Sequence, residues 1–346
     1  MTVAVRIYRD QELWPRLAAW QPLCRDLPHS RRPGWLRVLA SGLQHQAIGL
    51  EAQRQHELCG ILPLAYVQSL LFGRFLVGLP YLNYGGVLAD AEDVARALID
   101  RAIELADELE VRFLELRHET AATHSRLATR EQGKVQMRLP LPSSADELWT
   151  ALDAKVRNQV RKAEKQGLTT DWGRAELLPD FYDVFSRRMR ELGTPVYSRQ
   201  LFTSILDEFP DDAEFAVVRA GNTALAAALV LHGPTMTEAP SAASRRERQD
   251  SNANMFLYWQ LLRRAIERGQ RTFDFGRSDP DSGTYRFKGQ WGAVPAPTAW
   301  QYYLRKGSME DMRPGNAKFS LAVKMWRKLP LPVTRWLGPW IVRGIP

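Results

Sequence analysis

Two parts of this 346-residue chain repeat the same order of predicted elements. In the first, a strand and a loop precede an amphipathic helix over residues 90–109, and the next strand ends in Arg-Phe-Leu-Glu-Leu-Arg117. In the second, a strand and a loop precede a helix over residues 254–268, and the next strand ends in Thr-Phe-Asp-Phe-Gly-Arg277. The shared order predicts two copies of one α/β unit.

Charge sets the end of the chain apart from the rest. Residues 311–346 hold seven Lys or Arg residues and one Asp, so they carry +6 of the net charge of +8. The basic character is mostly a property of this tail, which argues against a nucleic-acid-binding body. We therefore expect a first domain over residues 1–142, a second over 143–310 and a basic tail over 311–346.

Composition excludes several classes of protein. With 45% hydrophobic and 25% charged residues, the chain resembles a soluble globular protein. It contains no window apolar enough to span a membrane, and its N-terminus reads as a strand rather than a leader peptide. Two cysteines and six histidines show no metal-ligand spacing. We expect a cytoplasmic monomer without a metal site.

The stretch from Phe273 to Gly292 carries the densest chemistry. A short apolar strand containing Asp274 leads into a loop, after which Tyr285, Arg286, Phe287 and Lys288 alternate rings with cations. A strand-loop segment of this kind can direct two cations across a cleft, toward an anionic substrate or an oxyanion formed during acyl transfer. The alternative is an edge strand with solvated cations.

A helix predicted over residues 153–166 gathers more positive charge. Its apolar stripe is flanked by five cations, Lys155, Arg157, Arg161, Lys162 and Lys165, against Glu164 alone from Val156 onwards. A solvated helix usually mixes its signs, so this face either meets an anion or is an ordinary surface.

Over nearly its whole length the chain resembles the FemAB family of aminoacyltransferases, which have tandem GNAT-like domains. It is most similar to members associated with the exosortase/PEP-CTERM system and exopolysaccharide clusters. The resemblance is carried by Tyr81–Gly86, Leu114–His118, Lys155–Ala163, Gly193–Arg199, Asn254–Trp259, Phe273–Gly292 and Arg343–Pro346. It implies an α/β (α+β) fold of two GNAT-like domains with mixed sheets, followed by a basic helical tail.

The same resemblance implies a reaction. In studied relatives the donor is an aminoacyl-tRNA and the acceptor is a peptidoglycan precursor. For this chain we expect an amide bond on an amine of an anionic envelope or lipid-linked glycan, with no tightly bound cofactor. The Lys of the family's Tyr-x-Phe-Lys stretch, here Lys288, is implicated in catalysis. Expected substrate contacts are Arg286, Tyr285, Arg277, Lys155, Arg157, Arg161, Tyr81, Asn83, Tyr84, Tyr197, Arg199 and Asn254.

Other features limit the mechanism. No Ser-His-Asp or Cys-His arrangement is legible, so we expect direct transfer with Lys288 as the oxyanion stabiliser. Asp274 either orients or deprotonates the amine, or is a structural residue at a strand end. The loop at residues 245–253 has no glycine to cradle the pyrophosphate of coenzyme A, which weighs against an ordinary acetyl-CoA enzyme.

The chain departs from the family pattern in two places. It has no long charged coiled coil that could serve as the arm some relatives use near tRNA. Residues 239–249 lack the rings and the Asn expected there, which predicts an altered substrate or reduced activity. A donor that is an acyl thioester of coenzyme A or acyl carrier protein stays open, as does a non-catalytic binding role in polysaccharide assembly.

The tail has an amphipathic pattern. Phe319, Ala322, Val323 and Trp326 share one face of a helix that Pro330 and Pro332 should end, and Trp336 and Trp340 follow. This face either packs on the second domain or lies on the inner face of an anionic membrane, and both hold if the cations point outward.

Overall fold

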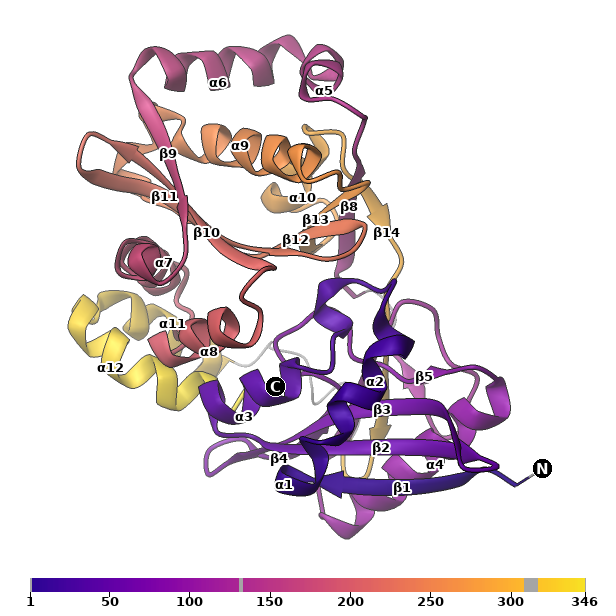
Figure 1. The fold of residues 1–346 in the computed structure, drawn as a ribbon. Helices are drawn as coiled ribbons and strands as arrows, with labels where there is room; N and C mark the ends of the chain where they lie inside the picture. The colour runs from indigo at the N-terminus through magenta and orange to yellow at the C-terminus, as the bar shows by residue number, and fades with distance from the viewer. Residues whose placement is uncertain (1, 131–132, 308–316, 346) are drawn as a thin grey trace. The chain divides into compact units, whose positions relative to one another are not determined.

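The computed structural model describes residues 2–130, 133–307 and 317–345, except for the side chains of 247–249 and 317–320. Internal contacts divide the chain into two units. Unit 1 comprises Met1–Gly133, Pro297–Ser320 and Trp340–Pro346, and unit 2 comprises Lys134–Ala296 and Leu321–Pro339. The fold is mixed α/β, as predicted, with one mixed sheet in each unit (Figure 1).

Unit 1 is built on a sheet whose strand order is β1-β2-β3-β4-β6-β15-β7, with β5 paired to β3. Helix α4 covers one face, where its apolar stripe packs on β2, β3 and β6. Helices α1 to α3 also pack on this sheet, with Leu13 and Trp20 against Gly49 of β2. The elements are β1 (Ala4–Arg9), α1 (Asp10–Leu13), α2 (Arg16–Cys24), η1 (His29–Arg31), α3 (Trp35–Leu43), β2 (Gln46–Arg54), β3 (Glu57–Ser69), β4 (Gly73–Val77), β5 (Leu88–Ala89), α4 (Glu92–Glu108), β6 (Phe113–His118), β7 (Ala128–Thr129) and β15 (Ala299–Leu304).

Unit 2 is built on a sheet whose strand order is β14-β8-β13-β12-β11-β10-β9. Its elements are β8 (Val135–Pro140), α5 (Ala145–Ala151), α6 (Ala154–Lys165), β9 (Leu168–Gly173), η2 (Ala175–Leu177), α7 (Leu178–Leu192), α8 (Arg199–Glu208), β10 (Ala213–Ala220), β11 (Thr223–His232), β12 (Met236–Ser244), η3 (Arg246–Ser251), α9 (Ala253–Glu267), β13 (Thr272–Ser278), α10 (Gly283–Gly289) and β14 (Val294–Ala296). Two helices of the tail, α11 (Ala317–Lys328) and α12 (Leu331–Val342), follow β15.

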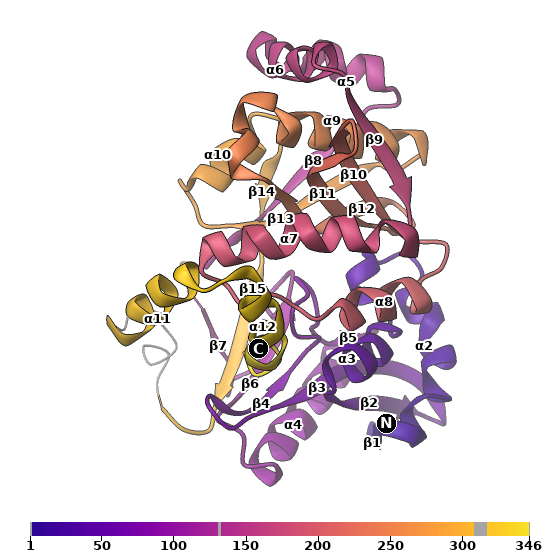
Figure 2. The ribbon, with the colours of Figure 1, turned by 90° about the vertical axis from the view of Figure 1, so that its left-hand side faces the viewer.

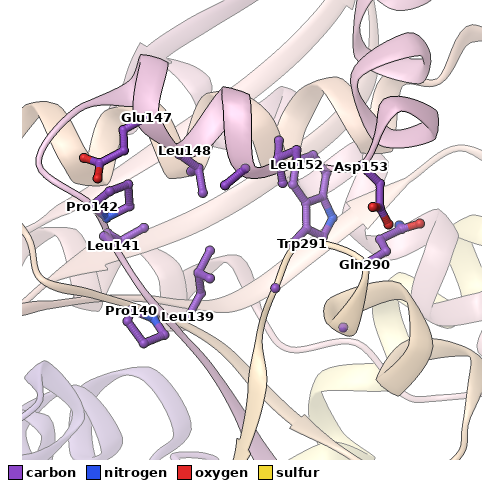
Figure 3. A pocket seen from close by; sticks show the side chains of 13 residues that line it. Leu139, Pro140, Leu141, Pro142, Glu147, Leu148, Leu152, Asp153, Gln290 and Trp291 are labelled. Carbon is purple, nitrogen blue, oxygen red and sulfur yellow. The ribbon is translucent and has the colours of Figure 1, made fainter.

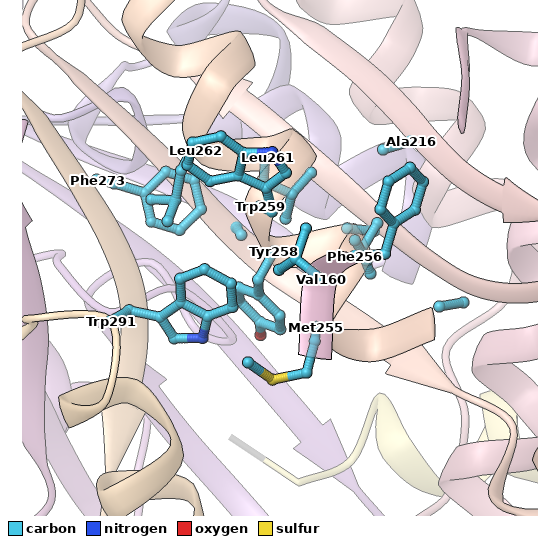
Figure 4. Packing of buried hydrophobic residues seen from close by; sticks show 14 of the residues in the cluster. Val160, Ala216, Met255, Phe256, Tyr258, Trp259, Leu261, Leu262, Phe273 and Trp291 are labelled. Carbon is cyan, nitrogen blue, oxygen red and sulfur yellow. The ribbon is translucent and has the colours of Figure 1, made fainter. Parts of the chain in front are cut away.

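Both faces of the unit 2 sheet are covered, which explains why β11 is apolar along almost its whole length. Helices α9 and α6 lie on one face, and α7 lies on the other (Figure 2). On the first face Tyr258 and Trp259 of α9 pack with Phe273 and Trp291 in one buried cluster (Figure 4). On the second, Phe181 of α7 stacks on Phe215 of β10 with ring centroids 4.5 Å apart.

The predicted repeat is present in the structure. In unit 1, β4 and β6 are parallel neighbours joined through α4, with Phe75 opposite Phe113. In unit 2, β12 and β13 are parallel neighbours joined through α9, with Met236 opposite Thr272. The parallel pairing ends at Glu238 and Asp274, although β12 continues to Ser244 beside β11. The two strands therefore part at the point where Asp274 lies.

Long-range strand pairing moves the domain boundaries from those expected at 142/143 and 310. Strand β8 pairs with β13 and β14, so unit 2 begins at Lys134. Strand β15 pairs with β6, which returns residues 297–307 to unit 1. The tail is not a separate unit, because Leu321–Pro339 belongs to unit 2 and Trp340–Pro346 to unit 1.

The tail differs from its prediction in a second way. Pro330 ends α11, but Pro332 lies in the first turn of a further helix, α12, where its missing N–H costs no hydrogen bond. Thr334 and Val342 are buried along one face of α12, and Arg335 donates to Ser186 and Asp183 of α7. Within the described residues, no helix is long and apolar enough to cross a membrane.

Candidate active site

The end of α10 carries the buried cation that the sequence singled out. Ser282 caps this helix by accepting a hydrogen bond from the Tyr285 backbone N–H at 3.1 Å. One turn later, the Lys288 ammonium donates to the carbonyl oxygens of Gly276 and Arg277, at 2.9 and 3.0 Å. Lys288 is 7% exposed. Burial lowers its pKa to about 8, although the Asp274 charge acts in the opposite direction.

The two carbonyl groups are available because β13 is irregular where they lie. The register between β13 and β8 shifts between Asp274 and Arg277, and Gly276 has a φ of +78°, which favours glycine. Phe275 and Gly276 have no partner residue in β8 at this bulge, whereas Arg277 resumes the pairing opposite Gln136. An ammonium has three donors, and Lys288 uses two of them here. Among the residues that the structure describes, the third N–H of Lys288 has no hydrogen-bond partner.

The contacts of Asp274 favour its structural alternative. Its carboxylate is 1% exposed and accepts from the Gln136 side chain and, at 2.7 Å, from the Gly276 backbone N–H. Arg138 lies 3.4 Å from its second oxygen. These bonds join β8 to the bulge that holds Lys288, so Asp274 positions the site from within the sheet.

The segment around Lys288 is a helix, which corrects the predicted strand or loop over residues 285–288. Tyr285 is half-buried and packs against the unit 2 core, whereas Arg286 is exposed. Arg277 is half-buried at the end of β13. Asp274, Arg277, Tyr285, Arg286 and Lys288 thus share one strand and one short helix, as the sequence segment requires.

A cavity of about 570 Å³ borders the last residues of α10 (Figure 3). Apolar side chains form most of its wall, two carboxylates lie at its rim, and no Lys or Arg lines it. The Trp291 indole, 1% exposed, belongs to this wall, and its N–H has no hydrogen-bond partner in the described part of the chain. The lining residues are Leu139, Pro140, Leu141, Pro142, Glu147, Leu148, Ala151, Leu152, Asp153, Gly289, Gln290, Trp291 and Gly292.

The cations of α6 do not line this cavity, although α6 begins at its edge. Arg157 donates to the carbonyl oxygens of Trp149 and Thr150, and the Arg161 guanidinium lies 5.4 Å from the Trp149 ring centroid. Lys155 is exposed. Two of the three expected substrate contacts on α6 therefore stabilise the corner between α5 and α6.

Other expected contacts in unit 2 lie on separate elements. The Tyr197 carbonyl accepts from the Tyr182 hydroxyl at 2.9 Å, and the exposed Arg199 lies over the Tyr182 ring. Asn254 is half-buried in the first turn of α9, behind Asn252, whose φ is +54°. These residues build the start of α8 and α9.

In unit 1, the loop over residues 81–86 is held by its own fold. Tyr84 is fully buried and Asn83 is half-buried. The Tyr81 hydroxyl lies 3.1 Å from the carbonyl oxygens of both Val342 and Arg343, so Tyr81 anchors the end of the chain. A Cβ on Gly85 would overlap the Gly78 carbonyl, which gives this glycine a packing role.

Next to this loop lies a cation that the sequence analysis missed. Arg31 is 8% exposed, and its guanidinium donates to the Val87 carbonyl at 3.3 Å. No carboxylate of the described residues lies within ion-pair distance of it, and burial lowers its pKa, although the Glu119 charge acts in the opposite direction. Its sequence context, Ser30-Arg-Arg-Pro33, has no periodicity that would distinguish it from a surface arginine.

The element that holds Lys288 lies within a recognisable domain. Residues 151–289 match the family model of the acetyltransferase (GNAT) domain. This GNAT domain runs from the end of α5 to the end of α10 and includes Asp274 and Lys288. A search of the curated proteins found no matching sequence.

Solved structures extend the likeness to both units. A structure of FemX has a TM-score of 0.67 at 16% identity, covering 88% of this chain and 97% of its own. The C-terminal domain of a putative lysylphosphatidylglycerol synthetase from Agrobacterium fabrum has a TM-score of 0.56 at 13% identity, covering 90% and 95%. A tandem GNAT protein from the clavulanic acid biosynthesis pathway has a TM-score of 0.54 at 11% identity, covering 88% of this chain and 100% of its own. The chain thus has the tandem GNAT, FemX-like fold that the sequence predicted.

Proposed function

We propose that this chain is a FemAB-like N-acyltransferase. It forms an amide bond on an amine of a cell-envelope or exopolysaccharide-related acceptor, by direct transfer without a covalent enzyme intermediate. The observation that carries this proposal is the Lys288 ammonium, fixed on two backbone carbonyls within the GNAT domain with one N–H remaining. The FemX-like fold supports an aminoacyl group as the transferred acyl group.

Lys288 suits the charge that develops during acyl transfer. The acceptor amine attacks the acyl carbonyl carbon, the carbonyl π electrons move to oxygen, and a tetrahedral oxyanion forms. This intermediate expels the donor's alkoxide or thiolate, which takes up the proton that the amine loses. A cation already oriented by two hydrogen bonds stabilises the oxyanion without reorganising. Burial strengthens this interaction.

Arg31 fits an anionic acceptor. A buried guanidinium with one carbonyl partner has donors left for a phosphate or carboxylate group, which it would bind in the bidentate manner typical of arginine. We propose that Arg31, within unit 1, binds the acidic part of the acceptor.

The donor is proposed to be an aminoacyl-tRNA rather than an acyl thioester. The segment before α9 has no glycine, and Asp250 in it lies near the helix N-terminus, where its charge would oppose a pyrophosphate. One fold neighbour is described as a putative lysylphosphatidylglycerol synthetase, which also favours an amino acid as the transferred group.

The proposal is tested by mass spectrometry of envelope glycans and lipids from cells with and without this gene, and from cells carrying only Lys288→Ala. An amine that loses an acyl or aminoacyl mass in both mutants supports it, and supplies the acceptor for assays with aminoacyl-tRNA or acyl-CoA. If Lys288→Ala restores the wild-type products, the chain acts as a binding protein and the catalytic proposal is wrong.

A further inference from the structure

Large apolar side chains are exposed at one end of unit 1. The turn between β3 and β4 carries Leu70, Leu71 and Phe72; Leu70 is fully exposed and Leu71 is 77% exposed. The turn has a defined shape, because the Ser69 hydroxyl accepts hydrogen bonds from the backbone N–H groups of Leu71 and Phe72, at 3.3 and 3.2 Å. An ordered turn therefore keeps two leucine side chains exposed to solvent.

The end of the chain lies against the same turn. A Cβ on Gly344 would contact the Ser69 side chain, and Tyr81 holds the preceding two carbonyl groups. Trp340, in the last turn of α12, is 62% exposed, and the Arg343 guanidinium lies 4.3 Å from its ring centroid. The turn over residues 70–72 and Trp340 therefore belong to one region of unit 1.

Packing of α12 explains why its tryptophans face outward. Thr334, Gly338 and Val342 follow each other at intervals of four and are buried. Trp336 and Trp340 are also four residues apart, on the face away from this stripe, and both are exposed. Two large indoles thus lie on a surface that the described residues leave exposed.

Cations surround this apolar region. The backbone N–H of Arg112 donates to the Arg74 carbonyl, and the Arg112 carbonyl accepts from Lys306. The Arg112 side chain donates to the Phe72 carbonyl at 3.3 Å. None of Arg74, Arg112, Lys306 and Arg343 makes an ion pair with a described residue, whereas Arg305 lies 3.7 Å from Asp107 and from Glu110.

We propose that the turn over residues 70–72, together with Trp340 of the same unit, docks on an anionic lipid bilayer. Leucines inserted between headgroups bury apolar area, and indoles favour the interface, where one edge is wet. Each cation near an anionic surface adds to the attraction. This docking proposal does not depend on the proposed acyl transfer.

The test relies on the burial of both native cysteines, Cys24 and Cys59, which protects them from labelling. A Leu71→Cys variant of the full chain would therefore take an environment-sensitive fluorophore selectively. Vesicles of equal parts phosphatidylcholine and phosphatidylglycerol should shift its emission to the blue, and vesicles of phosphatidylcholine alone should not. The label at Val294→Cys, an exposed apolar position on β14, is the matched control and should not respond.

Co-sedimentation with the same vesicles measures the contribution of each element. Leu70→Ser with Leu71→Ser, or Trp340→Ser alone, should lower the partition coefficient by about tenfold or more, equivalent to about 1.4 kcal/mol. Val294→Ser should leave it unchanged, and circular dichroism should show every variant folded. Wild-type partitioning of both the double and the single variant would overturn the proposal. So would equal binding to neutral vesicles, or dissociation of an oligomer by the same substitutions without any effect on vesicles.

Discussion

The Lys288 ammonium lies 2.9 Å from the Gly276 carbonyl oxygen, so the last turn of α10 is bonded to the bulge of β13. This contact fixes the cation before any substrate arrives. It also joins the two halves of the sequence segment over residues 273–292, the strand and the short helix. The proposed catalysis and the local structure therefore depend on the same side chain.

The first prediction concerns the protonation of Lys288. Its pKa of about 8 means that the ammonium is lost as the pH rises through 8, and acyl transfer that needs this cation should fall with it. Lys288→Ala should lower kcat by about a hundredfold or more. Lys288→Arg should keep a cation at high pH and move the alkaline limb upward. The checks are pH–rate profiles, with Arg263→Ala on the exposed face of α9 as the control.

The second prediction separates a structural Asp274 from a general base. The Asp274 carboxylate accepts from two donors, which its removal would leave unpaired. Asp274→Ala should therefore lower the free energy of unfolding by about 1–3 kcal/mol, and with it the urea midpoint. Asp274→Asn keeps one acceptor oxygen and should cost less. If Asp274→Asn has wild-type stability but no activity, the carboxylate takes a proton from the amine, and the structural interpretation is wrong.

The third prediction concerns Arg31 and rests on the proposed anionic acceptor. Arg31→Gln should raise KM for that acceptor by roughly 10- to 100-fold, because this is the loss of affinity expected when a hydrogen bond to a charged group is removed. The free energy of unfolding should not fall, because the substitution removes a buried charge. Arg37→Gln, an exposed position on α3, is the control. An unchanged KM would exclude Arg31 from the acceptor site.

The elements follow from the sequence where their signals are local. Helical spacing predicts α4, α6 and α9, and all three are present. The Gly221-Asn222 pair is a hairpin signal, and β10 and β11 form that hairpin. Ser144 and Glu147 have the spacing of a capping box, and Ser144 caps α5 by accepting from the Glu147 N–H at 3.2 Å. Each of these features depends on residues within one or two turns of each other.

The remaining features depend on distant partners. The alternation of rings and cations at residues 285–288 has the period of a strand, but the Ser282 cap and packing against the core make it a helix. Strands β8 and β15 join sheets far away in the sequence, which no local pattern records. Arg31 differs from a surface arginine only because the fold buries it. Lys288 is fixed by carbonyl groups at a bulge in β13. Neither could be read from spacing.

The fourth prediction concerns the docking of α12. Arg335 donates to Asp183 at 2.6 Å and to Ser186 at 2.9 Å, and Asp183 also accepts from Arg187 and Arg245. Because both partners are partly exposed, Arg335→Ala should cost only about 1 kcal/mol, but it should selectively increase amide hydrogen exchange in α12. Lys328→Ala, at the exposed end of α11, should not change exchange there.

The fifth prediction concerns stability at low pH. Glu214 of β10 lies 2.9 Å from both His232 of β11 and Arg264 of α9. Burial alone would raise its pKa, but hydrogen bonds from His232 and Arg264 lower it to about 2, from 4.5. A carboxylate with a depressed pKa stabilises the fold above its unfolded pKa, and this contribution is lost as the pH falls from 4.5 toward 2. The expected contribution is on the order of 2–3 kcal/mol at neutral pH.

Glu214→Gln should therefore flatten the decline in unfolding free energy between pH 5 and about 2, as measured by urea denaturation at each pH. Glu104→Gln, on the exposed face of α4, is the matched control, and an identical pH dependence in both variants would show that the contacts of Glu214 do not stabilise the sheet.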